Sequence, residues 1–264
     1  MPIRQPELLD YKHYRRPVLR ATGGAMADTH LAIVLNSANV ECRAFVKHFP
    51  ATQPRSLFNE WFGHCLMAAL GIPQPPAAIM PAPRLGAPEQ LEWAFVSFMP
   101  TPVCEGTPKE IYNYHDLSQL KVLADRLMQC HAFASMVAAD QLCMNNDRNL
   151  GNIVFTGAKS FVVIDHNQIL GGNDWQRDDL LKPTEWVRSV PIDVCNLTGK
   201  LSTSTASALV ASAEVNAETL WDCFAELREA LTQSDPENAN LALNAVWWRS
   251  LELANWFKKE LQLL

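Results

Sequence analysis

The sequence predicts an α+β fold of two lobes, with a small β-rich lobe over residues 1–100 and a larger helical lobe over residues 101–264. The first hundred residues hold short apolar runs of strand length between turn residues, whereas apolar residues further along the chain recur at helical spacing. A proline-containing connection over residues 100–108 separates the two patterns. The length of 264 residues is sufficient for two small lobes that share a cleft.

Composition and charge argue against several classes of protein. Of the residues, 48% are apolar and 19% are charged, which is typical of a chain that packs a core. The net charge of −6 argues against general binding of nucleic acids, since such proteins present a basic face. The N-terminal segment lacks the apolar stretch of a signal peptide, and no run of about twenty apolar residues predicts a membrane span. The seven cysteines, odd in number and without a C-x-x-C pair, are typical of reduced thiols, so we expect a cytoplasmic protein.

The β-rich lobe is expected to hold five strands and one helix. Strands are predicted at residues 17–21, 31–35, 42–47, 78–80 and 93–99. Between the third and the fourth of them, apolar residues at helical spacing predict a helix over residues 57–70. Ser56 is placed to cap this helix, and Gly71 and Pro73 are placed to end it.

The helical lobe is expected to begin with one long helix over residues 117–142, marked by a continuous apolar stripe. A polar loop over 145–152 and a β-hairpin formed by 153–155 and 161–164 would follow it. Residues 200–264 are expected to be helical, with large apolar side chains that supply packing, although some of the tryptophans could form a partner surface instead. These side chains are Trp221, Phe224, Leu227, Trp247, Trp248, Leu251, Leu253 and Trp256.

Three polar residues around the hairpin form the candidate catalytic centre. Asp147 and Asn152 lie five residues apart in the polar loop, and Asp165 directly follows the apolar run that ends the hairpin. This D-x-x-x-x-N…D arrangement is that of kinase-like catalytic and metal-binding loops. Asp147 would orient or deprotonate an attacking hydroxyl, while Asn152 and Asp165 would ligate Mg²⁺ against nucleotide phosphates. In the alternative interpretation, Asp147 is a turn residue and Asn152 caps the start of a strand.

The β-rich lobe supplies candidate phosphate-binding residues. Lys47 ends an apolar strand and Glu60 lies on the helix that follows, which is the order of the lysine–glutamate pair that binds ATP phosphates in kinases. Taken alone, each of the two would be a solvated surface charge. Gly23 and Gly24 form a turn between the first two strands, where a phosphate-covering loop would lie, although a plain turn has the same composition.

Three further residues are candidate contacts of the nucleotide. Phe98 and Met99 end the last predicted strand, next to the connection between the lobes, and their position there predicts that they meet adenine through backbone hydrogen bonds. His166 adjoins Asp165. It either orients this carboxylate or the phosphates, or it is a structural histidine held by hydrogen bonds.

Sequence motifs in both lobes combine into a family pattern. In the helical lobe, N-D-R at 146–148 precedes Asn152, and I-D-H occupies 164–166. In the β-rich lobe, the motifs are Gly23-Gly24, F-V-K at 45–47, N-E at 59–60 and L-G-I-P-Q-P at 70–75. Over residues 17–170, this combination resembles the compact HipA-like kinases of bacteria, which are distant relatives of the phosphatidylinositol 3-/4-kinases.

The resemblance implies an atypical protein-kinase fold, ATP with Mg²⁺ as the phosphate donor, and often serine or threonine hydroxyls as acceptors. The chain departs from the family pattern at two places. Asn167 stands where the family commonly has a glycine after Asp-His, and Ala25 and Met26 follow the paired glycines in place of a serine. The resemblance does not cover the helical segment from residue 175 onward.

Three other functions are open alternatives. Aminoglycoside and choline kinases, which act on small molecules, share D-x-x-x-x-N…I-D but usually carry His-Gly before the aspartate, where this chain has Asn145 and Asn146. The second alternative is a catalytically silent pseudokinase that serves as a partner-binding module. The third is nucleotidyl transfer, with ATP bound in the reverse direction. The acceptor is accordingly either a protein or a small molecule.

Overall fold

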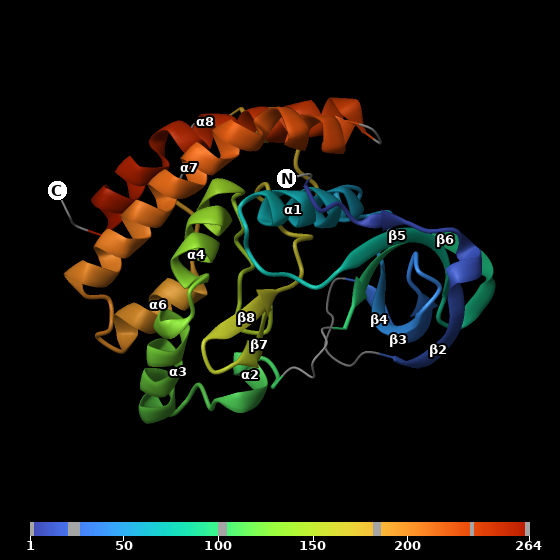
Figure 1. The fold of residues 1–264 in the computed structure, drawn as a ribbon, viewed down its shortest axis with the longest axis horizontal. Coiled ribbons are helices and arrows are strands. Elements are labelled where there is room, and N and C mark those ends of the chain that lie inside the picture. The colour runs from blue at the N-terminus through green and yellow to red at the C-terminus, as the bar shows by residue number, and fades with distance from the viewer. Residues whose placement is uncertain (1–2, 21–26, 100–104, 182–185, 233–234, 262–264) are drawn as a thin grey trace.

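The computed structural model describes residues 3–20, 27–99, 105–181, 186–232 and 235–261, and it confirms the predicted two-lobed α+β architecture of a kinase-like fold (Figure 1). A six-stranded sheet forms the first lobe, and helices with a two-stranded ribbon form the second. The sheet curls on itself at the right of Figure 1, while the helical lobe occupies the left.

The sheet of the first lobe is almost entirely antiparallel. Its strands are β1 (Glu7–Leu8), β2 (Tyr14–Arg20), β3 (Asp28–Leu35), β4 (Glu41–His48), β5 (Ala77–Arg84) and β6 (Ala87–Phe98). Their order is β1-β5-β6-β4-β3-β2, and β1 and β5 are the neighbours that run parallel. The five predicted strands overlap β2 to β6. Inward-facing side chains of β3, β4, β5 and β6 form a separate apolar core inside the curled sheet.

Helix α1 (Ser56–Ala69) lies between the two lobes. It contacts β6 on one side and α7 (Thr203–Thr232) on the other, and its apolar side chains join the core of the helical lobe. The predicted cap at Ser56 is wrong, because the helix begins at this residue and its N-cap is Arg55. The Ser56 hydroxyl and backbone N–H both donate to Gln53, so a tight turn starts the helix in place of a side-chain cap.

The second lobe surrounds the ribbon with helices. Its elements are α2 (Pro108–Ile111), α3 (Leu117–Gln129), α4 (Phe133–Leu142), β7 (Ile153–Gly157), β8 (Ser160–Val163), α5 (Arg177–Leu180), α6 (Val190–Leu197), α7 and α8 (Pro236–Glu260). The predicted hairpin is confirmed as β7–β8, and the long helices α7 and α8 confirm the helical C-terminal segment. These two helices run side by side and cover α4 (Figure 1). None of the helices in the described residues is both long enough and apolar enough to cross a lipid bilayer.

The prediction of one long helix over residues 117–142 is wrong, because the segment forms two helices, α3 and α4. Cys130 ends α3 in an extended conformation, with φ −75° and ψ 125°, and its N–H donates to the carbonyl of Leu127. Leu127 and Phe133, on either side of the break, are buried in the same core. The apolar pattern therefore continues through the break, and no glycine or proline marks it.

The predicted packing role of the C-terminal tryptophans is confirmed only in part. Trp247 packs against Trp221 and Phe224, with ring centroids 6.0 and 4.8 Å apart. Trp248 does not pack in this way, since it is 68% exposed. Neighbouring residues of a helix point about 100° apart, so a packed face that holds Trp247 does not have to include Trp248. Helical spacing identifies an apolar stripe, but it does not tell which side chains at its edge are covered.

Candidate active site

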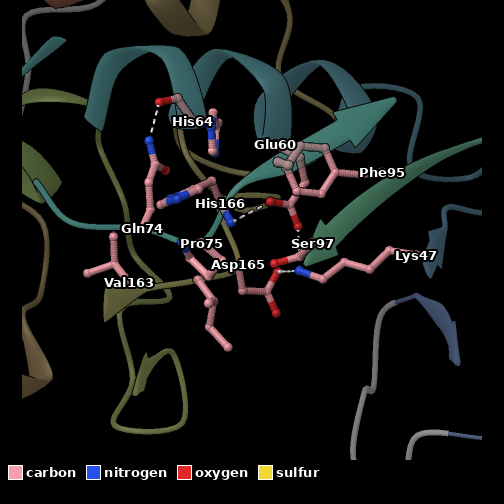
Figure 2. Close-up of a pocket in the computed structure, with 12 residues that line it drawn as sticks. Lys47, Glu60, His64, Gln74, Pro75, Phe95, Ser97, Val163, Asp165 and His166 are labelled. Carbon is pink, nitrogen blue, oxygen red and sulfur yellow. Dashed lines mark hydrogen bonds and ion pairs between the residues drawn. The ribbon is translucent and has the colours of Figure 1, made fainter. Parts of the chain in front are cut away.

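Lys47 joins three separate segments of the chain at the boundary between the lobes. It lies at the end of β4, opposite Phe95 of β6 in the sheet register. Its Nζ donates to Oε1 of Glu60 on α1 at 2.7 Å and lies 3.2 Å from Oδ1 of Asp165, which follows β8 (Figure 2). The predicted lysine–glutamate pair is therefore formed, and the structure brings Asp165 to the same ammonium group.

Burial differs among these three charged groups. The side chain of Glu60 is fully buried and that of Lys47 is 11% exposed, whereas the side chain of Asp165 is 34% exposed. Burial alone would lower the pKa of Lys47, but the carboxylates of Asp165 and Glu60 outweigh it and raise that pKa. Burial likewise opposes ionisation of Asp165, yet Lys47 holds the pKa of Asp165 below its usual value. The site therefore presents a charged ammonium beside a carboxylate that solvent can reach.

The backbone at Asp165 is held in an uncommon conformation. Its φ is +63°, in the left-handed region that few residues other than glycine adopt. Hydrogen bonds to the two neighbouring residues hold Asp165 in this conformation. The carbonyl of Ile164 accepts a hydrogen bond from Arg148 Nη1 at 2.8 Å, and the N–H of His166 donates to Glu60 Oε2 at 3.0 Å. Strain of this kind persists where the surroundings determine the conformation, and it is common at functional sites.

Asn59, the residue before Glu60, holds the segment that follows Asp165. Its Nδ2 lies within 2.7–3.1 Å of the backbone carbonyls of Asn167, Ile169 and Gly172. Its Oδ1 accepts a hydrogen bond from the indole of Trp175 at 3.0 Å. Sequence reasoning noted Asn59 in a motif but gave it no task, because its partners lie more than a hundred residues further along the chain. It is a positioning residue for the loop that carries Asp165.

A second buried ion pair holds the loop that carries Asp147 and Asn152. Arg148 and Asp140 of α4 are both 1% exposed, and the Arg148 guanidinium donates to both carboxylate oxygens of Asp140 at 3.0–3.2 Å. Arg148 Nη1 also donates to the carbonyl of Asn152 at 3.2 Å. Asn145, in turn, donates from Nδ2 to Asp140. Asp140 was not singled out from the sequence, where it is one acidic residue within a helix.

The amide of Asn152 is oriented by the same loop. Its Nδ2 donates to the backbone carbonyl of Asp147 at 2.8 Å, so Oδ1 is the amide atom that can ligate a cation. Asp165 adds a partly exposed carboxylate. Oxygen donors of these two kinds suit Mg²⁺, which takes few protein ligands and completes its coordination with phosphate and water oxygens. The donor set therefore fits the predicted metal.

His166 lies inside the protein, away from solvent. It is 3% exposed, its Nδ1 is 3.4 Å from Arg148 Nη2, and its ring packs against Gly63 of α1. Burial and the neighbouring Arg148 hold the pKa of His166 well below its usual value, so the ring is neutral. This location favours the structural interpretation of His166 over direct contact with phosphates.

The remaining nucleotide-binding candidates lie at the edge of the described residues. Gly23 and Gly24 fall outside them. Phe98 is buried, and its backbone N–H donates to the carbonyl of Pro76, while the N–H of Met99 donates to the carbonyl of Arg43. Both donors are therefore engaged within the first lobe, and adenine recognition at these two residues would have to use their carbonyl oxygens.

A small cavity lies beside Lys47 and Asp165, between α1 and the strands β5 and β6 (Figure 2). Its volume is about 10 Å³, which is the room that one water molecule needs. His64 and Gln74 line it, and among the described residues no partner is found for His64 Nε2 or Gln74 Oε1. The cavity fits a buried water molecule and is too small for a nucleotide, whose phosphates would have to meet Asp165 from its exposed side.

Comparison with known proteins gives a similarity of structure without a match of family. No protein-family model and no curated protein matches the chain. Among solved structures, the chain is similar to a crystal structure described as that of CtkA, a proinflammatory kinase of Helicobacter pylori. The sequences are 14% identical, the match covers 94% of this chain and 99% of the other, and the TM-score is 0.45.

Replacement of Gly63 tests the close packing of α1 against the Asp165 loop. A methyl group at Gly63 would lie 2.5 Å from Cβ and 2.8 Å from Cγ of His166. Alanine favours a helix over glycine by about 1 kcal/mol, but overpacking of a core costs about 1–3 kcal/mol. We expect Gly63→Ala to lower the free energy of unfolding in urea titrations. A stabilised variant would contradict the close approach.

The buried His64 should make the protein less stable in acid. Burial lowers the pKa of His64 to about 4, so the folded protein keeps this ring neutral while the unfolded chain protonates it near pH 6.5. Stability is therefore lost as the pH falls through this window, by about 2 kcal/mol between pH 7 and pH 5 from this residue alone. In urea titrations, the free energy of unfolding of His64→Gln should fall less between pH 7 and pH 5 than that of the unchanged protein, by about the same 2 kcal/mol. Equal losses in the variant and the unchanged protein would contradict the assignment.

Proposed function

We propose that this chain is an ATP-dependent phosphotransferase that uses Mg²⁺ and transfers the γ-phosphoryl group to a hydroxyl, as a HipA-like serine/threonine protein kinase does. The observation that carries this proposal is the Lys47 ammonium, 2.7 Å from buried Glu60 and 3.2 Å from partly exposed Asp165. Phosphoryl transfer depends mainly on positioning and on neutralising phosphate charge, and these groups supply both.

Each residue has a role in this proposal. Lys47, oriented by Glu60, would bind the α- and β-phosphates, and backbone N–H groups at Gly23 and Gly24 would cover the phosphate tail. Asn152 and Asp165 would hold Mg²⁺, which when bound neutralises charge on the phosphate oxygens. Adenine would lie at the connection between the lobes.

Asp147 would act on the acceptor. The acceptor hydroxyl oxygen forms a bond to the γ-phosphorus, and the bond from this phosphorus to the oxygen bridging the β- and γ-phosphates breaks. The electron pair of the broken bond leaves with ADP. The hydroxyl proton passes to the Asp147 carboxylate and from there to solvent. The hydrogen bonds within the 147–152 loop support this role, because they fix the backbone of Asp147 and the side chain of Asn152, one of the two proposed metal ligands, in the same turn.

Two alanine variants separate catalysis from nucleotide binding. Asp147→Ala should lower the rate of phosphate transfer by about 10²–10⁴-fold while the Kd for Mg-ATP stays unchanged, because this carboxylate acts on the acceptor. Asp165→Ala should instead weaken the binding of Mg-ATP itself. Intact-mass measurement reports the transfer, and calorimetry with a non-hydrolysable ATP analogue reports the affinity. Asp222→Ala, at an exposed position on α7, is the matched control.

The outcomes of this experiment distinguish the alternatives. An added phosphate on the protein or on a supplied hydroxyl compound, lost in Asp147→Ala, supports the proposal. An added AMP would replace it with nucleotidyl transfer. Binding of Mg-ATP without transfer to proteins, peptides or small alcohols would replace it with a nucleotide-binding pseudokinase. Full activity in both variants would contradict the assigned site.

A further inference from the structure

A larger cavity opens beside the loop that carries the proposed catalytic residues. Its volume is about 430 Å³, and its walls come from α2, the start of α3, the 149–151 turn and the 188–197 segment. In Figure 1, α2 and α3 lie at the bottom of the helical lobe, and α6 lies at its left. The cavity is within the size range of ligand sites, which is about 300–1,000 Å³.

The catalytic loop itself forms one wall of this cavity. Asn149, Leu150 and Gly151 line it, and they stand between Asp147 and Asn152 in the sequence. Gly151 N–H donates to Asn149 Oδ1 at 2.7 Å, so the turn is closed on itself. A molecule in the cavity therefore lies against the same turn that positions the proposed base and a proposed metal ligand.

The lining combines an apolar surface with an unsatisfied donor. Leu120, Leu150 and Val194 are buried apolar residues of the wall, and Leu197 at the rim is 69% exposed. Tyr114 also lines the cavity, and among the described residues no hydrogen-bond partner is found for its buried hydroxyl. A buried hydroxyl without a partner costs free energy, so this group favours a ligand that accepts its hydrogen bond.

The charged side chains that line the cavity are two basic residues and one acidic residue, and Glu110 lies near enough to Tyr114 to act on its charge. Arg188 pairs with Asp193 at 2.7 Å, and both line the cavity. Lys109 is exposed, and within the described part of the chain it makes no ion pair. The stem of Lys109 lies over the catalytic loop, since a methyl group at Gly151 would be 3.8 Å from its Cδ. The Lys109 ammonium can therefore bind an anionic group of a ligand next to the apolar wall.

From these features we infer that the cavity is the acceptor site, and that it selects a protein segment whose serine or threonine lies near a large apolar side chain and a carboxylate. This inference rests on the proposed kinase function. The apolar side chain would pack on the wall of Leu120, Leu150 and Val194, and the carboxylate would meet Lys109 and the Tyr114 hydroxyl. The open rim at Leu197 and Arg188 favours an extended chain that continues beyond the cavity, because small-molecule sites enclose most of their ligand.

Peptide substrates of defined sequence test the inference. The probe is a set of peptides with one central serine, in which leucine and glutamate are each moved through the flanking positions. With the full chain and Mg-ATP, kcat and KM are measured for each peptide. Fluorescein-labelled versions with the serine changed to alanine give Kd by anisotropy, without Mg-ATP. We expect the preferred peptides to need both the leucine and the glutamate.

Three variants assign the preference to the cavity. Lys109→Glu should raise KM and Kd for the preferred peptide about tenfold, and a peptide with glutamate changed to lysine should regain affinity for this variant. Leu197→Asp, which places a carboxylate at the rim of the apolar wall, should weaken the preference for leucine. Tyr114→Phe should raise Kd without lowering the stability of the protein, because it deletes only an unpaired hydroxyl. Lys159→Glu on the β7–β8 turn and Leu8→Asp on β1, both exposed, are controls and should match the unchanged protein.

Failure of the inference and failure of the proposed function give different results. If peptides are phosphorylated but the three cavity variants behave as the controls do, the cavity is not the acceptor site and the kinase function stands. Transfer to small alcohols and to no peptide would also overturn the inference alone. If the chain neither binds Mg-ATP nor transfers phosphate, the proposed function fails and the inference fails with it.

Discussion

The buried carboxylate of Glu60 is the constraint on which the site depends. Burial raises the pKa of Glu60 to about 7, and two partners favour its charged form against this effect: the Lys47 ammonium and the backbone N–H of His166. Removing one partner of a buried ion pair typically costs about 3–5 kcal/mol of stability. The contacts of Glu60 therefore hold β4, α1 and the segment after β8 together. Asn59 adds hydrogen bonds from the neighbouring position to the same segment. The loop with Asp165 is thereby fastened to α1 at two adjacent residues.

A second buried pair repeats this principle on the other side of the site. Arg148 donates to Asp140 of α4, to the carbonyl of Asn152 and to the carbonyl of Ile164. One guanidinium thus connects the loop of Asp147 with the segment that leads into Asp165. Arginine suits this task because its planar fork makes several hydrogen bonds in fixed directions. With both pairs formed, the positive φ of Asp165 is imposed by its surroundings and does not depend on local preference.

The sequence predicted the features that are local in the chain. Short apolar runs between turn residues located β3, β4 and the β7–β8 hairpin, and motif spacing selected Lys47 and Glu60, which the fold brings into contact. Two predictions were wrong because tertiary contacts decide the outcome: the unbroken helix over 117–142 and the cap at Ser56. Tertiary contacts also decide which C-terminal tryptophans are covered, and Trp248 is exposed. The cavity beside the catalytic loop could not be predicted, since its walls come from segments about 80 residues apart in the sequence. No periodic pattern connects Lys109 with Arg188, and only the fold brings them to one surface.

The most direct test of this account is a crystal structure of the chain with Mg²⁺ and a non-hydrolysable ATP analogue. The account predicts phosphate oxygens within hydrogen-bonding distance of Lys47 Nζ, and one Mg²⁺ ligated by Asn152 Oδ1 and the Asp165 carboxylate. The γ-phosphate should face the Asp147 side of the 147–152 loop. A nucleotide bound elsewhere, or a Lys47 ammonium that keeps both carboxylates while the phosphates lie away from it, would contradict the central claim that this ion network is a phosphate-binding site.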